Sequence, residues 1–330
     1  MERLLKRLLG RLPIGWLQLS HSKGRFAAAI AGVAFANLLV FMQLGIMGAM
    51  NAATVAPYGM FDSDLIISSE DSNTLTDGGN VARTWLFRAL ATPGISAGAP
   101  LFIGNLEFQL PDGTASTLQT FGLKITDAGF LIPSIADQFA QLSRENSVLL
   151  DTAIRGVAPE KFDTLKEGTA MSFEINGVTL TAVGTLEMGG GFSADGTLFA
   201  SDQTFLRLFG KRSSGAPNRI LLKVEDGVSV DVVLARVQAA VEQGAVTVQT
   251  LSGASETDLA YQLTERPTGI IFGFGVLIGI IVGIVIVYQV LSTDVANHLR
   301  EYATFKAIGY SQRFFFSIVL EEAVILALFG

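Results

Sequence analysis

Histidine, cysteine and paired carboxylates are the side chains best suited to catalysis, and their distribution in this sequence argues against an enzyme. The 330 residues contain no cysteine, which excludes thiolate chemistry and disulfides. The two histidines, His21 and His298, each lie beside a long apolar run. The residues between those runs therefore lack the usual zinc ligands and the usual base that activates a serine. We expect a non-catalytic chain with no metal site.

A nucleotide site is not predicted either. The fragment FGKRSSG, residues 209–215, lacks the glycine five residues before Gly210 that a P-loop requires. The glycine cluster EMGGGFSADGT, residues 187–197, is not G-x-G-x-x-G and is not followed by a helix of suitable length. It indicates a flexible turn between strands. We expect the chain itself to bind no cofactor.

Two long runs without charge indicate a membrane protein. Mean hydropathy is +0.46 and only 16% of residues are charged. No Asp, Glu, Lys or Arg occurs in residues 26–61 or 267–293, and a helix needs about 20 apolar residues to cross a bilayer. We place transmembrane helices at 25–50 and 267–291. A cleaved signal peptide is the alternative for the first, which is longer than the usual apolar region of such a peptide.

A third apolar run begins at residue 314 and continues to residue 330. Glu321 and Glu322 interrupt it, and acidic residues within a membrane segment are either functional or accommodated by helix packing. We favour packing, although the sequence does not define their role.

Charge predicts the orientation, because basic residues next to a span are retained in the cytoplasm. The first 25 residues contain six basic residues and one acidic residue, so the N-terminus is expected inside. Residues 62–266 contain 14 basic and 25 acidic residues, and we expect the domain of residues 51–266 outside. Residues 1–24 begin with leucines at helical spacing among basic residues, which favours an amphipathic helix on the inner membrane interface over a disordered basic segment.

The pattern within residues 51–266 predicts an α/β domain with two lobes. A strand, a helix and a strand occur in the same order near each end, at 61–69, 81–90 and 95–102, and again at 219–224, 231–243 and 246–251. We expect these units to form one lobe from about 55–103 and 215–262. Residues 104–210 would form an inserted lobe, with a turn at 111–113, a hairpin at Asn176-Gly177 and a helix at 201–209.

Small residues recur every fourth position in both predicted spans. This spacing lets helix backbones approach closely in lipid. We expect helix packing at Ala28, Gly32, Ala36, Gly275, Gly279 and Gly283.

Residues 292–313 form a short segment between the second and third apolar runs. Its pattern predicts an amphipathic helix from 294 to 308, with Gly309 ending it. One face carries Val295, Leu299, Tyr302 and Ala303, and another carries Asp294, His298 and Glu301.

The string REYATFKAIGYSQRFF, residues 300–315, resembles the signature of the FtsX/MacB-like permease superfamily. In that family a span is followed by R-E-(I/Y)-(G/A)-x-x-K-A-(I/L)-G and then a basic residue. The matching positions are Arg300, Glu301, Ala303, Lys306, Ala307, Gly309 and Arg313. This string and residues 13–45 and 195–210 together resemble the DevC type, the permease of a glycolipid exporter. The family has four spans, so we expect a chain truncated within its third membrane helix.

The resemblance implies the permease subunit of a mechanotransmission (type VII) ABC transporter in the bacterial inner membrane. A separate cytoplasmic ATPase would bind ATP and Mg, and its motion would reach a periplasmic domain with porter-like and sabre-like lobes. The residues implied in coupling to the ATPase are Arg300, Glu301, Tyr302, Ala303, Phe305, Lys306 and Gly309. Of these, Tyr302 or Phe305 would fill an apolar groove on the ATPase.

Further partners are implied by the same resemblance. We expect a homodimer in membrane lipid, a periplasmic membrane-fusion adaptor, a TolC-like outer-membrane protein reached through the adaptor, and no nucleic acid. Such a complex would drive the efflux of a lipid or another periplasmic substrate. One alternative is an FtsX/LolE-like lever without an adaptor, which extracts lipoproteins or activates hydrolases. A second is a receptor with an external sensor domain.

Overall fold

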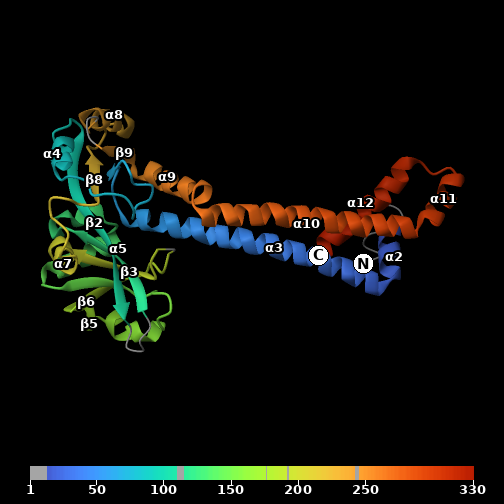
Figure 1. The fold of residues 1–330 in the computed structure, drawn as a ribbon, viewed down its shortest axis with the longest axis horizontal. Helices are drawn as coiled ribbons and strands as arrows, with labels where there is room; N and C mark the ends of the chain where they lie inside the picture. The colour runs from blue at the N-terminus through green and yellow to red at the C-terminus, as the bar shows by residue number, and fades with distance from the viewer. Residues whose placement is uncertain (1–12, 110–114, 176, 192, 242–244) are drawn as a thin grey trace. The chain divides into compact units, whose positions relative to one another are not determined.

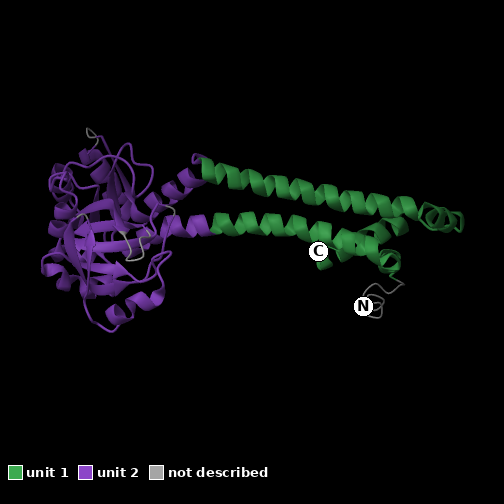
Figure 2. Ribbon diagram, turned by 60° about the horizontal axis from the view of Figure 1, so that its bottom comes forward, with its two compact units in different colours: residues 1–48, 267–330 green, residues 49–266 purple. Residues whose placement is uncertain are grey.

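The computed structural model describes residues 13–109, 115–175, 177–191, 193–241 and 245–330. It divides into two compact units, one of residues up to 48 together with 267–330 and one of residues 49–266 (Figure 2). The predicted helix over the first twelve residues and the predicted turn at 111–113 lie outside the described residues. The predicted fold class, apolar membrane helices joined to a large mixed α/β domain, is confirmed.

The first unit is helical. It contains α2 (Ile14–His21), most of α3 (Lys23–Val55), α10 (Pro267–Asn297), α11 (Leu299–Ala307) and α12 (Gln312–Phe329). Both long helices expose large apolar side chains, for example Phe41 on α3 and Ile284 on α10. By length and composition, the described chain has two helices that could cross a membrane, within Lys23–Met60 and Pro267–Asn297. A helix that is apolar all round is typical of a membrane span.

Helices α3 and α10 lie side by side and run in opposite directions (Figure 1). A methyl group added at Gly279 would lie 2.7 Å from Val40 Cγ2, and one added at Gly283 would lie 3.6 Å from Ala36 Cβ. Gly275 faces Gln43 in the same register. Glycine thus permits the close approach of the two helices. The fourth predicted glycine, Gly32, faces Ile286, whereas Ala28 is exposed.

The second unit is built on one sheet, which in the described residues has the strand order β5-β6-β4-β7-β3-β2-β8-β1-β9. Its strands are β1 (Leu65–Ser69), β2 (Ile95–Gln109), β3 (Ala115–Leu123), β4 (Ser147–Asp151), β5 (Met171–Ile175), β6 (Val178–Leu186), β7 (Gly196–Ser201), β8 (Arg219–Val224) and β9 (Val246–Thr250). The β3–β7 and β4–β6 pairs are parallel, and the other pairs are antiparallel.

One end of the sheet carries the two predicted strand-helix-strand units, β1–α4–β2 and β8–α8–β9. Helices α4 (Thr84–Leu90) and α8 (Val230–Val241) bury Leu86, Val233 and Val237 against this end, in a cluster that includes Leu65 and Ile220. The 3₁₀ helix η1 (Ala56–Met60) precedes β1, which therefore begins later than predicted. Helix α9 (Leu251–Thr264) leads out of the domain.

The other end of the sheet contains the predicted inserted segment. It adds α5 (Pro133–Phe139), α6 (Asp163–Lys166), α7 (Asp202–Leu208) and the 3₁₀ helices η2 (Ile125–Phe130), η3 (Ala140–Ser143) and η4 (Pro159–Phe162). Ser201 caps α7 by accepting a hydrogen bond from the Thr204 amide, and β5 and β6 form the predicted hairpin. The boundary predicted between residues 103 and 104 falls inside β2, which runs continuously through both ends.

Candidate coupling site

The segment after α10 forms an elbow, here defined as residues 298–311 between α10 and α12. We predicted one helix from 294 to 308, and the structure corrects this, because the backbone leaves helical geometry at His298 (φ −103°, ψ 11°). The amide and the Nδ1 atom of His298 both contact the Asp294 carbonyl oxygen, at 3.1 and 2.9 Å. The amides of Glu301 and Tyr302 donate to the His298 carbonyl, each at 3.0 Å, and so begin α11.

Gly309 ends α11 as the sequence predicts. Its φ of +106° lies in the left-handed region that favours glycine. Its amide donates to the Lys306 carbonyl and the Tyr310 amide to the Phe305 carbonyl, both at 3.1 Å, which together form a Schellman C-cap. Lys306 Nζ also donates to Gln312 Oε1 at 3.0 Å, across the turn into α12. The elbow therefore has a defined geometry.

Tyr302 is the anchor of the elbow. It is 9% exposed, its hydroxyl donates to Gln18 Oε1 on α2 at 3.1 Å, and its ring lies 5.6 Å from that of Phe315 on α12. Burial raises the pKa of Tyr302, so the phenol remains a protonated donor. The expectation that Tyr302 fills a groove on an ATPase is therefore wrong, because its side chain is buried within this chain.

The outer side of the elbow carries the other predicted coupling residues. Arg300, Glu301, Ala303, Lys306 and Gly309 are exposed, and Phe305 is half-buried against the rings of Tyr310 and Phe314. Sequence reasoning missed the exposed apolar side chains Ile308 and Tyr310, although apolar residues between basic ones at a helix end were a usable signal. A surface that mixes exposed apolar and charged groups is suited to binding a protein partner.

The two acidic residues of α12 have a packing role. Glu321 Oε1 accepts a hydrogen bond from the Trp16 amide at 3.1 Å, and this amide lies in the first turn of α2, where no partner exists within the helix. Glu322 is fully buried beside Asp294 of α10. A methyl group added at Gly15 would lie 3.0 Å from Glu322 Cγ, so glycine allows α2 to approach α12. Both contacts hold α2 against the base of the elbow.

Residues 273–330 match the family model described as FtsX-like permease C-terminal, and this match contains the whole elbow and α12. This part of the chain is therefore similar to the C-terminal region of FtsX-like permeases. No curated protein matches the chain.

Solved structures that are similar to the chain include two transporter domains. One is the periplasmic region of MacB from Actinobacillus actinomycetemcomitans, with 12% identity and a TM-score of 0.39, covering 60% of this chain and 94% of that one. The other is the extracellular domain of the noncanonic ABC-type transporter YknZ from Gram-positive bacteria, with 9% identity and a TM-score of 0.39, covering 57% and 98%. The fold of residues 49–266 is defined by its own strands and helices.

Proposed function

We propose that this chain transmits ATP-driven motion from a separate ATPase, bound at the outer side of the elbow, to the domain of residues 49–266. The observation that carries the proposal is the division of the elbow into two sides. Tyr302 is held inside the chain, while Arg300, Glu301 and Lys306 are exposed. This arrangement lies within the segment that matches the permease family.

The inner contacts explain how a force on α11 would be passed on. Tyr302 connects the elbow to α2 through Gln18, and Glu321 connects α12 to α2 through the Trp16 amide. Buried hydrogen bonds of this kind are costly to break, because each leaves a polar group without a partner. A movement of α11 would therefore displace α2 and α12 with it. ATP and Mg would be bound by the ATPase, and this chain would supply only the lever.

The charge distribution supports an orientation, and the family resemblance implies the assembly. The basic N-terminal segment would lie in the cytoplasm, and the acidic residues 62–266 would lie in the periplasm of a bacterial inner membrane. The elbow would then face the cytoplasm, where an ATPase can reach it. We expect two copies of the permease in each transporter.

The finer proposal is a tripartite exporter of the DevC type, with a periplasmic adaptor, a TolC-like outer-membrane protein and a glycolipid as cargo. It rests on the motif at residues 300–315 and on residues 13–45 and 195–210. A lever without an adaptor is the alternative, and co-purification of an adaptor with the full-length permease distinguishes the two. The receptor alternative is disfavoured because the elbow leads into α12 rather than into a signalling domain.

The coupling role is tested by Glu301→Arg in the full-length permease, assembled with its ATPase. Reversal of an exposed charge at the interface should lower substrate-stimulated ATPase activity by about threefold or more, while the complex still assembles. The matched control is Glu160→Arg, the same change at an exposed position of the domain 49–266. Equal activity of wild type and Glu301→Arg would refute the assignment of this surface.

A further inference from the structure

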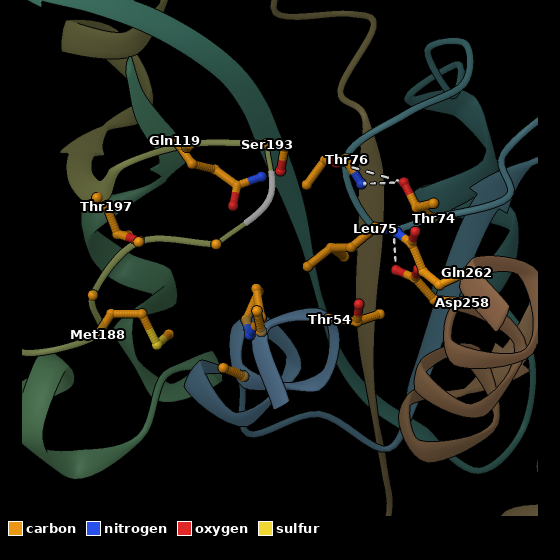
Figure 3. A pocket seen from close by; sticks show the side chains of 18 of the residues that line it. Thr54, Thr74, Leu75, Thr76, Gln119, Met188, Ser193, Thr197, Asp258 and Gln262 are labelled. Atoms are coloured by element: carbon orange, nitrogen blue, oxygen red, sulfur yellow. Dashed lines mark hydrogen bonds between the residues drawn. The ribbon is translucent and has the colours of Figure 1, made fainter. Parts of the chain in front are cut away.

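The domain of residues 49–266 contains a polar cavity of about 80 Å³ (Figure 3). Its floor is formed by residues 53, 54, 56 and 57, and one wall is formed by the end of α9 together with the loop of Thr74, Leu75 and Thr76. The opposite wall is formed by Gln119 on β3 and by residues 188–191 and 193–197. The cavity therefore lies between the two ends of the sheet, next to the segments through which the chain enters and leaves the domain.

Asp258 on α9 provides a buried carboxylate in one wall. It is 3% exposed, and its Oδ2 atom accepts hydrogen bonds from the Tyr58 hydroxyl at 3.1 Å and the Leu75 amide at 3.0 Å. The Gln262 side chain lies beside the carboxylate and acts to lower the carboxyl pKa, but no donor in the part of the chain that the structure describes meets Oδ1 with hydrogen-bond geometry. A buried acceptor of this kind requires a donor from elsewhere.

Gln119 provides the complementary group in the other wall. It is 6% exposed, and its Nε2 donor has no hydrogen-bond partner among the described residues. In Figure 3 its amide points towards Ser193, and the Thr74–Thr76 loop lies beyond Ser193. An unpaired buried donor destabilises the folded state, and a bound acceptor would remove that cost. A buried acceptor in one wall and a buried donor in the opposite wall thus both lack a hydrogen-bond partner.

The glycine loop of this wall is fixed in place by Asp151. We predicted a flexible turn, whereas the fully buried Asp151 carboxylate accepts hydrogen bonds from four backbone amides around the loop. These amides belong to Ala153, Met188, Gly189 and Thr197. A methyl group added at Gly190 would lie 2.8 Å from the Asp195 carbonyl oxygen, so the backbone is close-packed here. The wall of the cavity is therefore preformed.

We propose that this cavity binds a neutral hydroxyl-rich group, such as an edge of a sugar or another polyol. A hydroxyl can both donate to Asp258 Oδ1 and accept from Gln119 Nε2, and a polyol can serve both walls at once. The Asp258 carboxylate disfavours an anion, and Arg266 in the lining disfavours a cation. Threonine and serine hydroxyls around the cavity disfavour an apolar group.

This site is separate from the elbow, and its glycolipid arm rests on the cargo named in the proposed function. It involves only residues 49–266, so ATPase coupling and polyol binding can succeed or fail independently. The hydroxyl-rich group could belong to a soluble sugar or to the head of a glycolipid, and the experiment has one arm for each.

Because residues 1–330 contain no cysteine, a single thiol introduced there can be followed in the full-length permease in nanodiscs, with any cysteine outside these residues replaced by serine. Ser193→Cys introduces one thiol at an exposed position of the cavity rim. Its rate of modification by N-ethylmaleimide should fall when methyl β-D-glucoside is added, or when the nanodisc contains a glycosyl diacylglycerol. Adding Gln119→Leu should weaken this protection about three- to tenfold, the effect of losing one hydrogen bond.

Gln203→Leu is the matched control, because Gln203 lies outside the cavity lining, and it should leave the protection unchanged. Protection by the glucoside supports a soluble ligand, and protection by the glycosyl lipid alone supports a lipid head group. Protection by inorganic phosphate or choline with none by either sugar would overturn the proposal. So would an unchanged rate with every probe, which would mean that the cavity holds only water.

Discussion

Asp258 is a residue whose ionisation opposes folding of the domain 49–266. Burial raises the pKa of this carboxyl above its ordinary value of 3.8, although the hydrogen bonds from Leu75 and Tyr58 act in the opposite direction. The folded state therefore holds the proton more tightly than the unfolded state. The contribution of the protonated Asp258 carboxyl to the free energy of unfolding is complete below pH 3.8. It is lost as the pH rises through the raised pKa.

Asp258→Asn should remove this pH dependence while keeping an oxygen acceptor for Tyr58 and Leu75. The unfolding midpoint of wild type should fall relative to that of the variant as the pH rises from 3.8. Fluorescence of Trp85 in a Trp16→Phe background reports on this domain, since the sequence has two tryptophans. Parallel pH profiles of the two proteins would contradict the assignment.

Single residues show where sequence reasoning reaches its limit. The left-handed Gly309 was predictable, because one helix end demands it locally. The burial of Asp258 was not, because the Leu75 amide that it accepts from lies 183 positions away in the chain. Tyr302 was placed on the correct helix but given the wrong partner, since only the tertiary structure brings Gln18 to its hydroxyl.

At the scale of elements, the glycines of a strand make its length hard to predict from the sequence, yet they allow other side chains to pack closely on the sheet. The strand β2 contains Gly98, Pro100 and Gly104, residues that ordinarily interrupt a strand, and so its full length was not predicted. In the structure a Cβ on Gly98 would lie 2.6 Å from Leu86 Cδ1, and one on Gly104 would lie 2.6 Å from the Phe209 ring. These glycines make room for Leu86 on α4 and for Phe209, which follows α7.

The α3–α10 pair shows the same limit for membrane helices. The glycine stripe on α10 was predicted to pack, but periodicity contains no information about register between two helices. The observed register places Gly283 opposite Ala36 and Gly279 opposite Val40, which leaves Ala28 outside the contact. Packing in lipid depends on this fit of small residues against larger ones.

A cysteine pair tests the register of these helices. A Cβ at position 283 would lie 3.6 Å from that of Ala36, within the range of about 3.5–4.5 Å that a disulfide requires. Ala36→Cys with Gly283→Cys should therefore form an intramolecular disulfide on mild oxidation, visible as a reducible mobility shift after proteolysis between the helices. Ala28→Cys with Gly283→Cys is the control and should not react, because Ala28 lies about 12 Å further along α3.

For the molecule as a whole, the proposed lever requires that parts within the helical unit move together. The close contacts along α3 and α10 leave little room for sliding, because each step along the helix axis would drive Val40 into a new side chain. We therefore expect the pair to behave as one rigid element during the transport cycle. Conformational change would then occur in other parts of the protein and not between α3 and α10.

The disulfide between positions 36 and 283 turns this expectation into a measurement. If the pair moves as one element, oxidation should leave substrate-stimulated ATPase activity of the full-length complex within about twofold of the reduced value, a difference of roughly 0.4 kcal/mol. The complex without the two introduced cysteines controls for the oxidant itself, since residues 1–330 contain no other cysteine. If oxidation abolishes the stimulated ATPase activity and a reductant restores it, α3 and α10 must slide past each other. Relative movement of the two helices would then be the step that transmits the motion.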